Sequence, residues 1–289
     1  MKNLKEYLLL LIMFWNLENF YLDSRRFAIK RDLIVKTVMA VKDREGDFPA
    51  LIGLCETESY IATRMLVNNT PLQRLGYKII HRDSPDKRGI DVALLYRDEF
   101  FNLLNTRFLR VPSFRTRDIL YARGTVGADT LHIFVNHWPS KLGGEKSSSS
   151  KRMEVASLLK GVTDSIRSAN PSALIIAMGD FNDAPSSEAV KSLGLNNLSG
   201  KLKDSLNSSD SEVKGSHKFR GKWEMLDQFL VSDFVKGSAS LFYMPHLLTE
   251  DKKYYGVKIR RTFIGPRFVG GASDHLPILL RIKIVNLSP

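Results

Sequence analysis

The sequence has almost no cysteine, and it lacks an apolar segment long enough to cross a bilayer. Cys55 is the single cysteine among 289 residues, which excludes an internal disulfide framework and a cysteine-rich zinc site. Because Cys55 closes the apolar run at residues 50–55, we interpret it as a buried, inert thiol rather than a nucleophile. No internal repeat is evident.

Acidic residues are fewer than basic ones. The chain contains 43 Lys and Arg but only 31 Asp and Glu, so its formal net charge is +12. Such a surface attracts polyanions, which include nucleic acid, anionic lipid and phosphorylated small molecules. A merely basic soluble protein is the alternative interpretation. The hydrophobic content of 43% and aromatic content of 10% are typical of a globular protein with a sizeable core.

The N-terminal segment resembles a secretory leader in part. Lys2 and Lys5 precede and flank the apolar run at residues 7–15, but no small-residue cleavage site follows, and the run is too short to span a bilayer. It continues directly into residues 16–20, which contain a candidate site residue. We therefore interpret it as a buried first strand, with a leader remnant before it left open. A cytoplasmic location is favoured, and export is not excluded.

The rest of the chain alternates between predicted strands and helices. Apolar residues at helical spacing predict helices at residues 24–42 and 150–168. Polar segments at residues 143–150 and 196–221 predict loops. Short aliphatic runs bounded by polar turns predict strands at residues 9–14, 50–54, 77–81, 90–96, 131–136, 173–178, 228–231 and 278–284. We expect one domain over residues 1–289, with an α/β fold in which helices flank a mixed sheet system.

Three carboxylates lie next to predicted strands. Glu56 and Asp180 each follow a strand, and Asp274 shortly precedes one. Carboxylates fixed by a rigid sheet suit Mg²⁺, which prefers oxygen ligands and needs few of them from the protein. Asn16 and Asn182 add amides that can contact a phosphate or a water without repelling negative charge. Any one acid alone is more simply an exposed loop carboxylate, but the shared setting favours a metal site.

Two of the six histidines have a comparable setting. His275 follows Asp274, and His137 follows a predicted strand. Phosphoryl transfer to water needs charge stabilisation at the phosphate oxygens, where an imidazole can donate a hydrogen bond or a proton. Asp227 is the candidate carboxylate that orients such an imidazole. We interpret the remaining histidines as structural or surface residues: His81, His132, His217 and His246.

Together these segments resemble the endonuclease/exonuclease/phosphatase superfamily, which has the deoxyribonuclease I-like fold. The matching segments are residues 14–18, 54–57, 89–93, 136–140, 179–182, 226–229 and 273–275. The resemblance therefore covers nearly the whole chain. It implies a four-layer α/β/β/α sandwich with two packed mixed sheets, helices outside them and an active site at one edge.

The resemblance also implies a metal cofactor. Mg²⁺, with Mn²⁺ as an alternative, would be held mainly by Glu56, with help from Asn16 and Asp274. The expected reaction is in-line attack of water on phosphorus, with the metal neutralising the developing charge. The resemblance leaves open whether one or two metal ions take part.

The remaining candidates receive catalytic roles from the same resemblance. Asp180 and Asn182 would position or activate the attacking water. His275, oriented by Asp227, would contact the scissile phosphate, and His137 would be the second imidazole at that phosphate. Which group acts as the general base is left open.

The substrate is less well defined than the chemistry. Residues 214–267 contain eleven Lys and Arg against five Asp and Glu, interleaved with tyrosines, which suits phosphate contacts and base stacking. Arg115 and Arg117 are candidate phosphate clamps. We expect a monomeric nuclease. The alternatives are a phosphatase or phosphodiesterase acting on an inositol phosphate or a phospholipid headgroup, and a binding module without catalysis.

Overall fold

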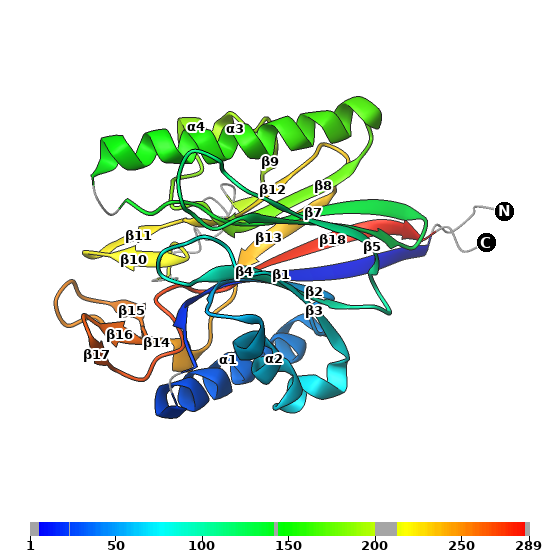
Figure 1. The fold of residues 1–289 in the computed structure, drawn as a ribbon. Helices are drawn as coiled ribbons and strands as arrows, with labels where there is room; N and C mark the ends of the chain where they lie inside the picture. The colour runs from blue at the N-terminus through cyan, green and yellow to red at the C-terminus, as the bar shows by residue number, and fades with distance from the viewer. Residues whose placement is uncertain (1–5, 23, 142–143, 200–212, 287–289) are drawn as a thin grey trace.

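The computed structural model describes residues 6–22, 24–141, 144–199 and 213–286. Two six-stranded sheets pack face to face, and helices cover both outer faces, which gives four layers (Figure 1). The predicted α/β/β/α sandwich is thereby confirmed. The question of a leader remnant falls on residues 1–5, outside the described residues. Among the helices of the described residues, none is both long and apolar enough to cross a membrane.

The first sheet is organised around its N-terminal strand. β1 (Glu6–Phe20) pairs in parallel with β2 (Leu51–Thr57) and antiparallel with β18 (Ile278–Asn286), so the two ends of the described chain lie side by side. The outer strands complete the order β13-β18-β1-β2-β4-β3: β3 (Tyr77–His81), β4 (Asp91–Arg97) and β13 (Gly237–Leu241).

The second sheet has the order β5-β6-β7-β8-β12-β9. β7 and β8 are parallel, and β12 runs antiparallel to β8. Its strands have the following bounds: β5 (Asn102–Leu109), β6 (Ile119–Val126), β7 (Asp129–His137), β8 (Leu174–Asp180), β9 (Asn196–Asn197) and β12 (Asp227–Val231). The central strand β8 is apolar from Leu174 to Gly179 because both of its faces are buried.

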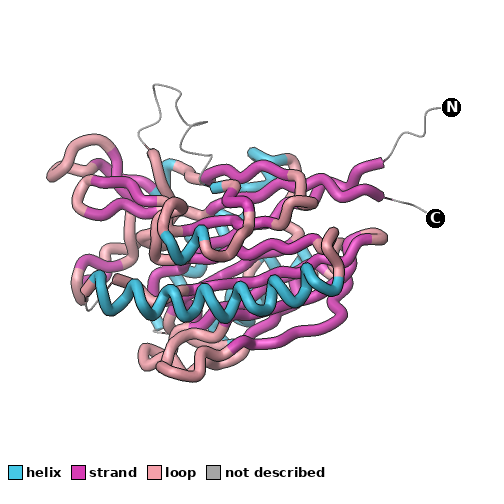
Figure 2. Tube along the Cα trace, turned by 90° about the horizontal axis from the view of Figure 1, so that it is seen from above, coloured by secondary structure: helices cyan, strands magenta, loops and turns pink. Residues whose placement is uncertain are grey.

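Each sheet has its own helices. α1 (Ser24–Glu45) and α2 (Tyr60–Asn68) cover the first sheet, while α3 (Glu145–Ala169) and the short α4 (Glu188–Lys191) cover the second. Figure 2 shows α3 lying lengthwise over its sheet. The sheets meet closely at Gly53, where a Cβ would lie 2.8 Å from the Met178 methyl carbon.

Three small hairpins and two short 3₁₀ helices complete the described chain. In Figure 1 the hairpins lie at the opposite end of the sandwich from the two termini. The elements are η1 (Pro71–Leu75), β10 (His217–Phe219) with β11 (Lys222–Glu224), η3 (Pro245–Leu247), β14 (Leu248–Glu250) with β15 (Val257–Ile259), and β16 (Phe263–Ile264) with β17 (Arg267–Phe268).

The predicted loop at residues 143–150 is wrong over most of its length, because α3 already begins at Glu145. Gly143 lies outside the described residues. The Ser148 hydroxyl donates to the Gly144 carbonyl at 2.9 Å, so a serine that favours turns in isolation supports the first helical turn instead. The predicted loop at residues 196–221 contains β9 and the whole of β10, and its residues 200–212 are outside the described part.

Several strands were not predicted, and polar residues hid them. β5 is an edge strand whose residues are exposed or partly exposed up to the buried Leu109, while β6 carries Arg123 and Gly124 in its middle. The predicted first strand is also too short, because β1 continues through Asn16 to Phe20. A strand whose polar residues are satisfied by tertiary contacts has no clear apolar period.

Candidate active site

Five of the candidate residues lie at one edge of the paired sheets. In the second sheet His137, Asp180 and Asp227 lie side by side, because Asp180 is in register with both of the others. In the first sheet Asn16 is in register with Cys55, next to Glu56. The strand ends of two sheets thus bring together side chains that are far apart in the sequence.

His275 and Asp227 form a buried hydrogen-bonded pair. Asp227 Oδ2 lies 2.6 Å from His275 Nδ1. Two side chains hold the backbone of this pair in place: the Trp15 indole donates to the His275 carbonyl at 2.8 Å, and the Ser216 hydroxyl accepts the Asp227 N–H at 3.1 Å. Burial lowers the pKa of His275, but the neighbouring carboxylates, Asp227 first, outweigh it and raise that pKa well above its ordinary value.

Asp180 lies between the two sheets and is 2% exposed. Its Oδ2 accepts a hydrogen bond from the Asn16 amide at 3.0 Å, and its Oδ1 accepts the Asn182 N–H at 2.8 Å. His275 Nε2 lies 3.9 Å from Oδ2. Burial, followed by the opposing effects of His275 and Asp227, raises the pKa of Asp180 to about 6. The carboxyl group can therefore exchange a proton near neutral pH.

Glu56 is aimed by an irregularity in its strand. It has a positive φ of 61°, at the point where the pairing of β2 with β4 shifts register. Such bulges re-aim a side chain. Its Oε2 accepts the Asn19 N–H at 2.8 Å, while Oε1 lies 3.7 Å from His137 Nε2 and 4.0 Å from the Arg88 guanidinium.

His137 is the electrostatic opposite of His275. Burial, and then the positive charges of Arg117, Arg88 and His275, lower the pKa of His137 well below its ordinary value. Its Nε2 lies 3.8 Å from Asp180 Oδ2, and its buried Nδ1 has no hydrogen-bond partner in the described part of the chain. The imidazole is therefore neutral at pH 7 and keeps one donor for a ligand.

Asp274 and Asn182 complete the site from two loops. Asp274 is partly exposed, with Oδ1 at 4.0 Å from His275 Nε2 and Oδ2 accepting a hydrogen bond from Arg261 at 2.7 Å. Asn182 has a φ of 49°, and its amide donates to the Trp138 carbonyl at 3.0 Å. The structure thus brings all eight of the predicted metal and catalytic residues to this edge.

The two predicted arginine clamps lie in different environments. Arg117 is 6% exposed, and its guanidinium donates to Asp86 at 3.0 Å and to the Trp138 carbonyl at 2.7 Å. It therefore supports the segment that carries His137 and Asn182. Arg115 is exposed, and its role as a phosphate clamp stays a prediction.

The donor set fits a hard divalent cation. Asp180, Asp227 and His275 form a group whose ligand atoms lie within 4.8 Å of one another, but the hydrogen bond to Asp227 already occupies His275 Nδ1. Glu56 instead presents Oε1 toward the site while Oε2 is fixed by the backbone. An oxygen-rich set held by backbone groups and amides suits Mg²⁺ or Mn²⁺.

Glu18 and Arg261 support the site, although neither is among the candidate site residues. The buried Glu18 carboxylate accepts the N–H groups of Thr262 and Phe263, and burial, with Asp274 next, raises its pKa to about 7. This contact fixes the chain beside Arg261, which binds Asp274. Glu18 lies in the matching segment at residues 14–18, but its contact with residues 262–263 has no local signal because the partners are more than 240 residues apart in the chain.

Comparison with known proteins agrees with this geometry. The family model described as "Endonuclease/Exonuclease/phosphatase family" matches residues 18–284. The chain belongs to the endonuclease/exonuclease/phosphatase family. Members of this family hydrolyse phosphoester bonds and generally depend on a divalent metal, so the predictions of an enzyme and of a phosphoester hydrolase are confirmed. No curated protein matches the chain.

Solved structures of the endonuclease/exonuclease/phosphatase fold superpose on nearly the whole chain. Truncated TDP2 from Caenorhabditis elegans is 16% identical, with a TM-score of 0.64 and coverage of 96% of this chain and 98% of that one. The human Nocturnin catalytic domain with bound sulfate is 19% identical, with a TM-score of 0.63 and coverage of 96% and 97%.

A third structure contains a nucleic acid. TDP2 from D. rerio, complexed with a single-strand DNA product, is 17% identical, with a TM-score of 0.60 and coverage of 96% of this chain and 99% of that one. At these identities the likeness establishes the shared fold, and the substrate of this chain has to be argued from its own residues.

Proposed function

We propose that the chain is a Mg²⁺-dependent nuclease that hydrolyses nucleic-acid phosphodiesters by in-line attack of water. Glu56 would hold the ion, with help from Asn16 and Asp274, and Mn²⁺ would substitute for Mg²⁺. Bound there, the cation supplies electrostatic stabilisation for the charge that develops on the phosphate. The buried Glu56 carboxylate, with one oxygen free of hydrogen bonds from the backbone, supports this assignment.

The remaining residues accept the proton of the water or donate hydrogen bonds to the phosphate. Asp180, with its pKa near 6, accepts the proton of the attacking water, and the Asn182 amide group helps to orient that water. The protonated His275, held by Asp227, donates from Nε2 to a phosphate oxygen. The neutral His137 donates a second hydrogen bond without adding charge.

A basic and aromatic surface beside His275 supports nucleic acid as the substrate. We call it the hairpin surface; it consists of exposed side chains from the turns of two hairpins: Phe219, Arg220, Lys222, Lys252, Lys253, Tyr254 and Tyr255. Tyr255 is 84% exposed and Phe219 is 55% exposed. Cations that contact phosphates, with aromatic rings on which bases stack, are what single-stranded nucleic acid requires.

The hairpin surface is fixed to the active site. The His217 and His275 rings lie 4.7 Å apart, and the two residues form a β-bridge. Lys218, next along β10, donates to Asp251 at 2.9 Å, which joins the two hairpins. A strand bound on the hairpin surface would therefore lead directly to the scissile position. This juxtaposition carries the proposal.

Cleavage of labelled single-stranded DNA and RNA, with and without Mg²⁺, tests the proposed activity. We expect cleavage that EDTA abolishes, that His275→Ala reduces by about 10²-fold or more, and that slows steeply as salt rises. Tyr255→Ala should raise KM about fivefold or more, since stacking on one ring contributes about 1–3 kcal/mol per base.

Phe234→Ala is the matched control for the hairpin surface. Phe234 is 53% exposed and follows β12 at Val231, whose register partner is Ile176, away from Asp180. This variant should leave KM unchanged. Intact DNA and RNA, combined with Mg²⁺-dependent release of phosphate from inositol phosphates or nitrophenyl esters, would instead establish the phosphatase alternative.

A further inference from the structure

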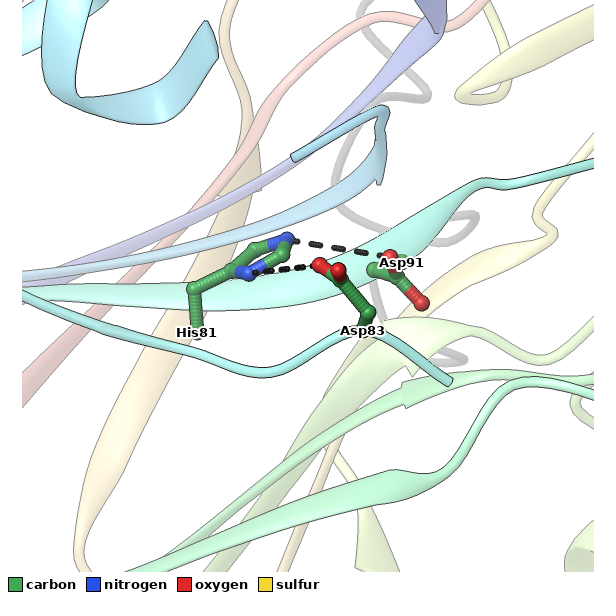
Figure 3. A group of neighbouring side chains, drawn as sticks. All are labelled: His81, Asp83 and Asp91. Atoms are coloured by element: carbon green, nitrogen blue, oxygen red, sulfur yellow. Dashed lines mark ion pairs between the residues drawn. The ribbon is translucent and has the colours of Figure 1, made fainter. Parts of the chain in front are cut away.

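A cluster of titratable side chains lies at the turn between β3 and β4, and the mechanism does not use it. His81 is the last residue of β3, Asp91 is the first residue of β4, and Asp83 lies in the connecting segment. His81 Nδ1 is 3.7 Å from Asp83 Oδ1, and His81 Nε2 is 3.8 Å from Asp91 Oδ2. Figure 3 shows both carboxylates on one side of the imidazole.

The His81 side chain is buried without a hydrogen bond. It is 1% exposed, although the residue as a whole is partly exposed, and neither ring nitrogen has a hydrogen-bond partner among the residues that the structure describes. Buried polar groups in native proteins are nearly always paired, so an imidazole buried between two carboxylates without a hydrogen bond indicates a ligand for one of its two ring nitrogens.

We propose that His81, Asp83 and Asp91 bind a divalent first-row transition cation. The three side chains offer ligand atoms that lie within 4.8 Å of one another. Donors around one such ion lie up to about 4.2 Å apart, since each bond is about 2.1 Å long, so small rotations would enclose it. A mixed imidazole and carboxylate set favours Mn²⁺, Fe²⁺ or Zn²⁺ over Mg²⁺, which prefers oxygen alone.

The two carboxylates have complementary roles in this site. Asp91 is fixed, because its Oδ1 accepts the Ser84 N–H at 2.8 Å while Oδ2 faces the imidazole. Asp83 is 81% exposed, so the ion can reach the site from solvent without opening the fold. With the imidazole neutral, the two carboxylates give the site the charge of −2 that balances a divalent ion.

The proposed ion would join the two ends of the segment at residues 82–90, because His81 and Asp83 lie at one end and Asp91 at the other. This segment supplies two residues that approach the active site. Asp86 accepts a hydrogen bond from Arg117 at 3.0 Å, and Arg88 lies 4.0 Å from Glu56 Oε1. The proposed cation site uses none of the proposed Mg²⁺ ligands, and it would hold the segment from which Arg88 approaches Glu56.

Mn²⁺ binding to the full-length Glu56→Gln chain, in excess Mg²⁺, tests this site without relying on catalysis. We expect one bound Mn²⁺ per chain, with coupling to a histidine nitrogen in pulsed electron paramagnetic resonance. His81→Gln should abolish that coupling. Asp83→Asn, at an exposed position that does not threaten folding, should weaken binding about tenfold or more, since loss of even an outer-shell partner costs a metal site about 10- to 100-fold.

Asp98→Asn is the matched control, because Asp98 is 64% exposed and follows β4 outside the cluster. It should leave the Mn²⁺ affinity and the nitrogen coupling unchanged. The proposal is overturned if the Glu56→Gln chain binds no Mn²⁺, or if His81→Gln and Asp83→Asn bind it with unaltered affinity and unaltered nitrogen coupling.

Discussion

At the scale of single residues, the site gives the same side chain two opposite protonation states. His137 and His275 are both buried and both lie within 4 Å of Asp180 Oδ2. Only His275 has a carboxylate against its second nitrogen, while His137 is exposed to the positive field of two arginines. One imidazole is thus cationic and the other neutral at the same pH. A phosphate bound between them would accept one hydrogen bond from a charged donor and one from a neutral donor.

Asp180 should set the acid limb of the pH profile. Its pKa is raised to about 6, so below about pH 6 it is protonated and cannot accept the proton of water. We expect kcat/KM to fall about tenfold per pH unit below this value and to level off above it. Because a nearby cation favours the charged form, the midpoint should move to lower pH as Mg²⁺ is raised.

Rates between pH 5 and 8, at several Mg²⁺ concentrations, check this. Asp180→Asn should lose about 10²- to 10⁴-fold in rate and should lose the acid limb as well. A wild-type rate that does not change between pH 5 and 7 would exclude Asp180 as the proton acceptor.

At the scale of elements, the close approach of β7 and β8 positions the catalytic groups. Gly179 precedes Asp180 and has no room for a side chain: a Cβ there would lie 2.4 Å from the Asn136 carbonyl oxygen. Gly179→Ala should therefore push the strands apart beside His137. We expect a loss of about 1–3 kcal/mol in the free energy of unfolding, measured by urea denaturation, together with reduced activity.

Gly161→Ala in α3 is the matched control. A Cβ at Gly161 meets no atom within 4 Å, and alanine is about 1 kcal/mol better than glycine inside a helix. This variant should be slightly more stable than wild type and equally active. A Gly179→Ala variant with unchanged stability would show that the sheet tolerates the wider spacing.

At the scale of the whole molecule, we propose that the chain is one domain. β1 and β18 come from opposite ends of the sequence and pair along nine residues of register, and the sheets share one buried core that includes Phe14 and Met178. Neither sheet can expose its inner face to water without losing that core, so the two should unfold together.

Two buried tryptophans can report on the two sheets separately. Trp15 lies in β1, and Trp138 follows β7; both are 0% exposed. In chains that carry Trp223→Phe and either Trp15→Phe or Trp138→Phe, urea denaturation should give the same midpoint by fluorescence and by far-ultraviolet circular dichroism. Midpoints that differ between the two methods in either chain would indicate that the sheets unfold independently.

Much of the fold was readable from local pattern. The buried strands β2 and β8 each contain an unbroken apolar run, at residues 51–55 and 174–179, and a run of this kind predicts a buried strand from the sequence alone. The edge strand β5 contains no such run, because one face is solvated. The start of α3 was misread because serine has a weak helical preference that tertiary structure overrides. A strand that is buried on both faces can be predicted from its apolar sequence. A strand that is buried on one face depends on how the sheets assemble, which the local sequence does not show.

The sequence by itself determined the chemistry: hard oxygen ligands and imidazoles at the ends of apolar runs, in an order that resembles one superfamily. Only the tertiary structure decided how each group behaves. It turned Arg117 inward to Asp86, gave His137 and His275 opposite charge, and left His81 buried between Asp83 and Asp91 without a hydrogen bond. The physical reason is that the residue type sets whether a group can bind a proton or a metal ion. Whether it does so at a given pH depends on desolvation and on neighbouring charges, which come from residues far apart in the sequence.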